Sequence, residues 1–233
     1  MKQILIAVLT SLTIFVFGQT DSVSISGVVT DMDGNPEKNA MVMLKGSNFG
    51  DFVDTTYADK NGEYTLKVPE GKYSAVAAVN MEAYKKSKLE FWAYEIPAYK
   101  DLELDCKYGK LEVYGVNVFE VQGAYPGYMI YFRPMSLSRF ATADMSADLI
   151  DIAPPKEQMK IQVKVNGELV NVNSIQRIEE FAGKKKMYAY LMHVEKESDP
   201  QSGSKKIDLF VQDEDTGDKG QAIYFKEPDN YKQ

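Results

Sequence analysis

The chain has few side chains that could act as nucleophiles or bind transition metals. Its 233 residues include one cysteine, Cys106, and one histidine, His193. A Ser-His or Cys-His mechanism uses histidine as the base, and a zinc site needs several Cys, His or carboxylate ligands. No Gly-x-Ser-x-Gly motif is present. We expect Cys106 to be a small buried apolar residue and His193 to pack in a sheet, so the protein is predicted to be no enzyme and to need no cofactor.

Two acidic turns are the candidate cation sites, one at 31–35 and one at 213–218. Carboxylates grouped on a tight loop suit a hard cation such as Ca²⁺. Neither turn has the full calcium-loop spacing, in which a bidentate Glu follows the Gly by six residues. The second turn is the better candidate, with Asp213, Asp215 and Asp218 as the predicted ligands. The alternative is a solvated hairpin turn without a metal.

The densest aromatic cluster is the run Phe-Trp-Ala-Tyr at 91–94, followed by Tyr99. Strand alternation places positions 91 and 93 on one face and Trp92, Tyr94 and Ile96 on the other. Two apolar faces need two partners, one of which is the core of a sandwich. The other is packing between domains, a partner protein, or a glycan whose sugar rings stack on exposed aromatic rings. Trp92, Tyr94 and Tyr99 are therefore candidate ligand-binding residues.

Composition and charge narrow the class of protein. Hydrophobic residues make up 44% of the chain and charged residues 26%, as in folded proteins. There are 34 acidic and 27 basic residues, a net charge of -7. Nucleic-acid binding is not expected, because neutralising phosphates needs a surplus of Lys and Arg.

Residues 1–18 have the composition of a secretory signal peptide. Lys2 provides a basic start, 4–17 is an apolar run, and cleavage is expected after Gly18. The run is short for a membrane span, and an uncleaved anchor is the alternative. No other stretch is long and apolar enough to cross a bilayer. We therefore expect an exported protein, in the periplasm or at the outer cell surface, including the outer membrane.

Strands dominate the rest of the chain. Apolar and polar residues alternate at 23–29, 64–68 and 159–165, the pattern of a sheet packed on one face. Turn dipeptides recur, and a two-residue loop at 166–167 would pair Val163 with Val170 and Ile161 with Val172. Helical patterns are weak, with one possible turn at 141–150 and another at 174–181. These features are typical of an all-β protein built of β-sandwiches.

Two spaced motifs identify the first sandwich. They are Ile25-x-Gly27-x-Val29-x-Asp31-x-x-Gly34-x-Pro36 and Thr56-x-x-Asp59-x-x-Gly62-x-Tyr64-x-Leu66. This part of the chain resembles the carboxypeptidase regulatory-like domain, a transthyretin-like β-sandwich. Asn39 and Ala58 depart from the family pattern, in which Gly and Thr are usual. The resemblance implies an accessory module of an exported bacterial protein. Zinc peptidase chemistry would need two His and a Glu from another domain, and this chain has one His.

The sequence thus predicts a signal peptide at 1–18 and two β-sandwich domains. The first, 19–105, is carboxypeptidase regulatory-like, and the second, 106–233, is Ig-like or a related sandwich with a loop excursion at 136–158. We predict an exported, non-enzymatic accessory or interaction protein of the bacterial cell envelope, which acts through contacts with another envelope protein. The alternative is a carbohydrate-binding module that holds a polysaccharide on its aromatic sheet face.

Overall fold

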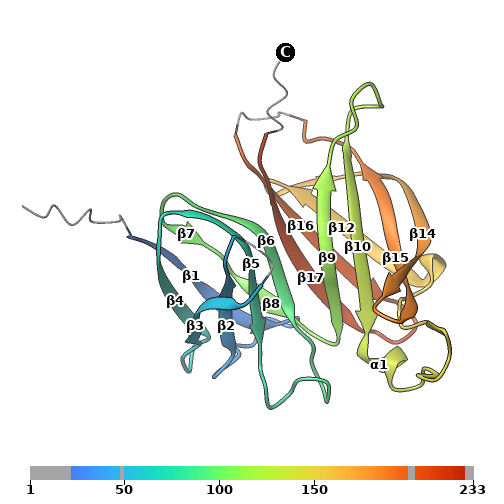
Figure 1. Cartoon of the computed structure of the whole chain (residues 1–233), viewed down its shortest axis with the longest axis horizontal. Helices are drawn as coiled ribbons and strands as arrows, with labels where there is room; N and C mark the ends of the chain where they lie inside the picture. The colour runs from blue at the N-terminus through green and yellow to red at the C-terminus, as the bar shows by residue number, and fades with distance from the viewer. Residues whose placement is uncertain (1–21, 48–49, 199–202, 229–233) are drawn as a thin grey trace, which may run out of the picture.

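The computed structural model describes residues 22–47, 50–198 and 203–228, and nearly all of its regular structure is strand (Figure 1). The predicted all-β fold is confirmed. The predicted signal peptide at 1–18 lies outside the described residues. No helix in the described part of the chain is long and apolar enough to span a membrane.

The largest sheet has eight strands and contains segments from both halves of the chain. Its parallel junction joins the two halves and pairs Ala222 with Trp92 and Tyr224 with Tyr94. The strands, in spatial order, are β13 (Glu168–Val170), β12 (Met159–Val165), β16 (Lys205–Asp213), β17 (Lys219–Lys226), β6 (Phe91–Ala98), β5 (Gly71–Val79), β2 (Met41–Lys45) and β3 (Phe52–Tyr57).

A small sheet packs on one face of this large sheet and encloses the first core. Its strands are β4 (Glu63–Pro69), β1 (Ser22–Asp31), β7 (Leu102–Glu103) and β8 (Cys106–Tyr108). The core includes Ile25, Leu66 and Phe91, together with Ile223 and Phe225 from β17. The C-terminal half of the chain therefore supplies part of the N-terminal core.

The motif residues form the turns and close approaches of this first sandwich. A side chain at Gly27 would place its Cβ 2.3 Å from the carbonyl oxygen of Leu104, so only glycine fits. The Asp31 carboxylate accepts hydrogen bonds from the backbone N–H groups of Asp33 and Asn35, each at 2.9 Å. Side-chain oxygens of this kind hold a turn by satisfying its backbone donors.

A five-stranded sheet packs against the other end of the large sheet and encloses the second core. Figure 1 shows its strands in front of β12, β16 and β17. The strands are β9 (Leu111–Phe119), β10 (Tyr128–Ser136), β11 (Leu149–Ile150), β14 (Val172–Ala182) and β15 (Lys185–Val194). Val113, Ile130 and Met192 meet Val163 and Leu209 in this core. The predicted sandwich architecture is confirmed for both halves.

The loop excursion predicted at 136–158 contains the regular helical elements of the described chain, α1 (Leu137–Phe140) and the 3-10 turn η1 (Lys156–Gln158). The weak helical pattern at 174–181 does not give a helix, because that segment lies in β14 and pairs with β15. Contact with a long neighbouring strand outweighs its weak helical pattern.

The hairpin at 166–167 is confirmed at its turn and wrong at its far end. Val163 pairs with Val170, as predicted. Ile161 pairs with Val211 of β16, and Val172 pairs with Val194 of β15. The chain leaves the hairpin after Val170 and crosses to the five-stranded sheet. The pairing set by the turn therefore ends with Val163 and Val170.

The predicted domain boundary falls at 105, between β7 and β8, and both of these strands pair with β1. The two halves also share the eight-stranded sheet. The division into 19–105 and 106–233 stays a prediction.

Candidate functional site

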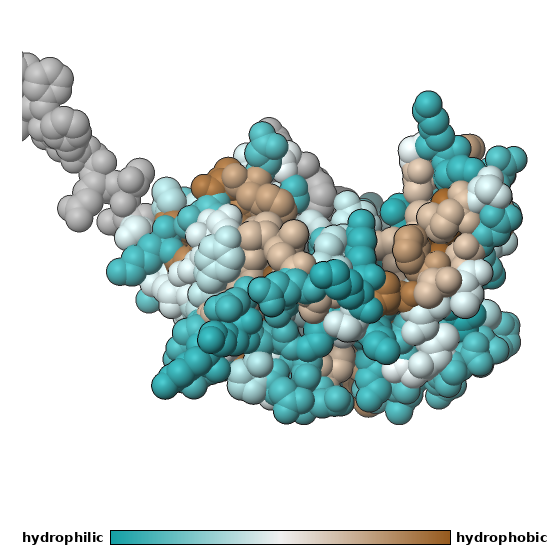
Figure 2. All heavy atoms as spheres, turned by 90° about the horizontal axis from the view of Figure 1, so that it is seen from below, coloured by the Kyte–Doolittle hydropathy of each residue, from teal (hydrophilic) through white to brown (hydrophobic). Residues whose placement is uncertain are grey.

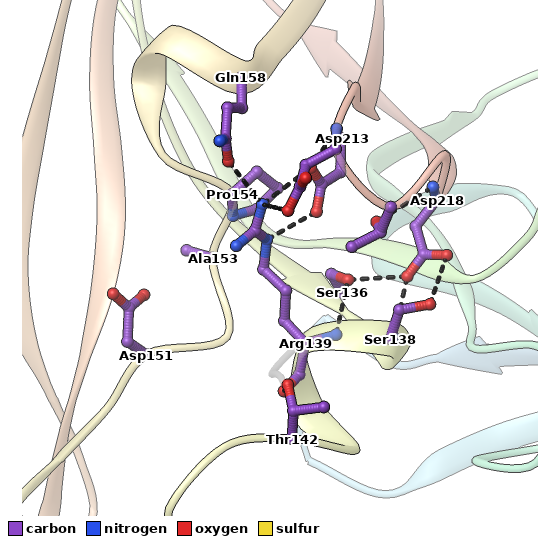
Figure 3. A network of polar contacts seen from close by, with 12 residues as sticks. Ser136, Ser138, Arg139, Thr142, Asp151, Ala153, Pro154, Gln158, Asp213 and Asp218 are labelled. Carbon is purple, nitrogen blue, oxygen red and sulfur yellow. Dashed lines mark hydrogen bonds and ion pairs between the residues drawn. The ribbon is translucent and has the colours of Figure 1, made fainter.

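The acidic turn at 213–218 connects β16 to β17, and Arg139 of α1 reaches it (Figure 3). Arg139 donates from Nε to Asp213 at 2.6 Å and from Nη2 to the other oxygen of the same carboxylate at 3.0 Å. Nη2 also donates to Gln158 at 2.9 Å and contacts Asp215 at 3.4 Å. Asp213 is fully buried, so the guanidinium is the counter-charge of a desolvated carboxylate.

Asp218 anchors the start of α1 from the same turn. Its carboxylate accepts hydrogen bonds from the Ser136 hydroxyl at 2.7 Å and from the Ser138 N–H and hydroxyl, both at 2.9 Å. Ser136 in turn accepts from the backbone N–H of Arg139 as the N-cap of α1. The turn and α1 thus form one buried polar network that ties the large sheet to the five-stranded sheet.

This network bears on the predicted metal ligands Asp213, Asp215 and Asp218. Burial raises the pKa of Asp213, but hydrogen bonds from Arg139 and Thr216 outweigh it and leave the pKa below its usual value. Within the described ranges, no group of three or more His, Cys, Asp or Glu side chains has an arrangement that could hold a metal. The calcium site stays a prediction, and the geometry favours the turn without a metal.

A chelator tests the metal directly. Because Arg139 already neutralises Asp213, we expect the melting temperature to be the same in excess EDTA and in millimolar CaCl₂. A bound ion stabilises only the folded state, so its removal would lower the melting temperature. A chelator-dependent fall that Asp215→Asn abolishes would establish the calcium site instead. Scanning calorimetry on metal-free protein provides the measurement.

Trp92 and Tyr94 lie in the middle of the molecule, each 6% exposed. Their rings are stacked at 6.0 Å between centroids, and Trp92 also meets Tyr114 of β9 edge-on at 5.4 Å. Both residues belong to the second core, whereas Phe91 and Ala93 belong to the first. The two apolar faces of β6 therefore have two protein partners. Ligand binding by Trp92 and Tyr94 stays a prediction.

The predicted face of Ile96 is wrong. It packs in the first core with Phe91, not on the side of Trp92. The preceding residue, Glu95, has a φ of 59°, which breaks the strand alternation. Tyr99 lies beyond the end of β6, is 52% exposed and donates a hydrogen bond to Glu227. It therefore does not form one exposed aromatic surface with Trp92 and Tyr94.

Glu112 is a buried carboxylate that the sequence analysis did not identify. It is 6% exposed and accepts a hydrogen bond of 2.9 Å from the indole N–H of Trp92. Burial and the nearby charge of Glu90 raise the pKa of Glu112 to about 8, despite opposing effects of Trp92, Lys85 and Arg133. The available sequence signal is a charged residue between Leu111 and Val113, in the apolar start of a strand.

Cys106 and His193 both lie in strands, Cys106 in β8 and His193 in β15. Cys106 is fully buried, as predicted, and burial raises the pKa of its thiol to about 12, which leaves it protonated. A neutral thiol is a poor nucleophile. The Nδ1 atom of His193 lies 3.2 Å from the side-chain amide of Asn173, and its ring contacts Tyr125 edge-on.

The large sheet ends in two edge strands, β13 and β3, and β3 is the edge in the N-terminal half. Among the described strands β3 pairs with β2 alone, so its outer backbone groups face away from the sheet. Three of its apolar side chains are exposed: Phe52 at 41%, Val53 at 60% and Tyr57 at 63%. Exposed apolar edges of this kind can accept a further strand. Figure 2 shows hydrophobic residues reaching the surface in both halves of the molecule.

Comparison with known families supports the N-terminal resemblance. Residues 24–91 match the model of the carboxypeptidase regulatory-like domain. The resemblance predicted from the two motifs is thereby confirmed for this part of the chain. No curated protein matches the sequence.

Several solved pilin structures are similar to the chain at low identity. The major pilin subunit BcpA of Bacillus cereus is 14% identical with a TM-score of 0.30, over 88% of this chain and 69% of that one. The major pilin SpaD of Corynebacterium diphtheriae is 9% identical with a TM-score of 0.29, over 88% and 64%. The shaft pilin SpaA of Lactobacillus rhamnosus is 8% identical with a TM-score of 0.27, over 91% and 100%. No functional conclusion for this chain follows from similarity at that level.

Proposed function

We propose that this protein, whose N-terminal part is a carboxypeptidase regulatory-like domain, is an exported, non-enzymatic interaction protein of the cell envelope. It acts by binding another envelope protein in the periplasm or at the outer surface. The observation that carries the proposal is the β3 edge, where a strand paired on one side only among the described residues carries exposed Phe52, Val53 and Tyr57. The partner contributes an extended segment that pairs with β3 and continues the eight-stranded sheet.

The chemistry of the edge defines the partner segment. Backbone hydrogen bonds supply affinity in strand addition, and alternate side chains supply specificity. The edge offers apolar side chains together with Asp51 and Asp54, and Lys45 lies over the ring of Phe52 at 4.3 Å. A complementary segment alternates apolar and basic residues. A binding role is consistent with the state of Cys106, whose thiol is buried and protonated.

Site-specific photo-crosslinking in intact producing cells tests this function. A crosslinker placed at Val53 is expected to give one discrete product with an exported protein. Adding Tyr57→Lys should abolish that product, because an inserted charge on the edge opposes strand addition. The matched control is Leu169→Lys at the opposite edge of the same sheet, where Leu169 is 61% exposed. Equal loss in both variants, or no product at Val53, would contradict the proposal.

A further inference from the structure

A second feature, which shares no residue with β3, is an open cleft of about 470 Å³ beside the buried Trp92–Tyr94 pair. Its walls come from β5, β6, β9 and β17. Its lining includes Ser74, Tyr94, Glu95, Tyr114, Asn117 and Tyr224. A volume of this size falls within the range of about 300–1,000 Å³ that is usual for small-ligand pockets.

The lining combines aromatic rings with uncharged hydrogen-bonding groups. Tyrosines from three strands surround the cleft, and Ser74 and Asn117 add a hydroxyl and an amide. Among the described residues no Lys or Arg lines it, and the one charged group in that lining is the carboxylate of Glu95. This composition disfavours phosphates and other anions. It also disfavours a lipid chain, since the polar groups would lose hydrogen bonds to water.

Both walls carry backbone features that shape the cleft. Glu95 has a φ of 59° in the middle of β6, a conformation that is strained in a residue other than glycine. Opposite it, β9 contains a β-bulge at Gly115, where φ is 65°. The Gly115 N–H donates to the Tyr94 hydroxyl at 2.7 Å and joins the walls. Bulges and strained residues concentrate at functional sites, where they re-aim side chains.

The strand pairing is also interrupted at this point. Tyr73 pairs with Ile96 and Ala75 with Tyr94, but Ser74 does not pair with Glu95. The Ser74 N–H instead donates to the carbonyl of Gly46 at 2.9 Å. The Glu95 carboxylate is held by Lys72 at 2.6 Å, which fixes its direction. The interruption and the bulge therefore meet at one cleft.

We propose that this cleft binds a neutral oligosaccharide. Sugar rings present apolar CH faces to aromatic rings and hydroxyls to polar groups. The partly buried rings of Tyr114 and Tyr224 and the exposed amide of Asn117 provide these contacts, whereas Tyr94 is buried and closes the cleft from below. Tyr224 and Asn117 come from different sheets, and the Tyr224 hydroxyl lies 3.5 Å from the Asn117 oxygen. They form a polar pair that a sugar hydroxyl can engage. The buried Trp92 lies behind the cleft and supports Tyr94 and Tyr114 without contacting the ligand.

The chain contains its own reporter of binding. Trp92 is the only tryptophan, and its ring contacts two tyrosines of the cleft. The experiment titrates the purified protein with maltohexaose, cellohexaose, xylohexaose and mannohexaose while recording Trp92 emission. We expect a saturable change with at least one of the four. Asn117→Ala should weaken that binding about tenfold, since Asn117 is exposed and its loss leaves the core intact.

Two further variants separate binding from folding. Tyr224→Phe keeps the ring and removes the hydroxyl, so it should weaken binding while the melting temperature changes little. Tyr125→Ala is the matched control, because Tyr125 is an exposed tyrosine outside the cleft, and it should bind as the wild type does. The proposal is overturned if none of the four sugars gives a saturable change up to about 10 mM, a concentration that would nearly saturate a site with a Kd of about 1 mM. Equal weakening by Tyr125→Ala would also overturn it. Neither result affects the β3 proposal, because the two sites share no residue.

Discussion

Replacing Glu112 with glutamine is expected to stabilise the protein strongly above pH 8 and to have little effect at pH 4.5. The wild-type carboxylate is buried beside Trp92, and its pKa is raised to about 8 by burial first and by Glu90 second. Glutamine has a similar shape, keeps an oxygen that accepts the indole N–H and carries no charge. The substitution therefore removes the cost of a buried charge and preserves the hydrogen bond.

The direction of the pH dependence follows from proton binding. The folded state holds the Glu112 proton up to about pH 8, whereas the unfolded chain releases it near 4.5. Below pH 4.5 both states are protonated and Glu112 costs nothing. Between pH 4.5 and about 8 the free energy of unfolding falls, and above about 8 the full cost is present. At about 1.4 kcal/mol per pH unit, we expect Glu112→Gln to gain about 3–5 kcal/mol at pH 9.

Urea denaturation at pH 4.5, 7 and 9 measures this gain. The matched control is Glu103→Gln, because Glu103 is exposed and its charge is solvated in both states. The difference between Glu103→Gln and the wild type should be close to zero at every pH. Wild-type Trp92 emission should also titrate near pH 8, and Glu112→Gln should lack that transition. A gain that is equal at pH 4.5 and 9 would show that Glu112 titrates normally.

Removing Arg139 is expected to destabilise the protein at neutral pH by about 3–5 kcal/mol, as when one partner of a buried ion pair is deleted. In Arg139→Leu, the fully buried Asp213 loses its two hydrogen bonds from the guanidinium and keeps its charge. The Gln158 oxygen also loses its donor. The network that ties the turn at 213–218 to α1 is then broken at its centre.

Two comparisons assign that loss to Asp213. The double variant with Arg139→Leu and Asp213→Asn should recover much of the stability, because no buried charge remains. The control is Asp215→Asn, whose side chain is 58% exposed and whose contact with Arg139 should contribute little. Protonation relieves the buried charge, so the defect of Arg139→Leu should shrink as pH falls towards 3. Recovery by Asp215→Asn, and not by Asp213→Asn, would contradict this assignment.

Local features of the fold were predictable because they depend on a few neighbouring residues. The alternation at 159–165 predicted β12, and the glycine spacing predicted the turns of the first sandwich. Cys106 was predicted to be buried from its residue type alone. The helical pattern at 174–181 failed because contact with β15 decided its conformation.

The candidate sites were less predictable, since each depends on residues far apart in the chain. Asp213 was visible as an acidic turn residue, but its partner Arg139 is 74 positions away. Trp92 was visible as part of an aromatic run, but its burial depends on β9 and on the parallel pairing of β6 with β17. The cleft depends on a positive φ at Glu95. The sequence does not predict this conformation, because glutamate rarely adopts it, unlike glycine, Asn, Asp or His.

By itself the sequence determined the all-β class, the first sandwich and the scarcity of catalytic side chains. Those properties follow from short-range periodicity, turn chemistry and composition, which act within a few residues. Tertiary structure alone decided that both halves share one sheet, that Glu112 is buried, and that three tyrosines meet at a cleft. Those outcomes follow from which strands become neighbours, and burial then determines which charges are desolvated and which rings reach a ligand.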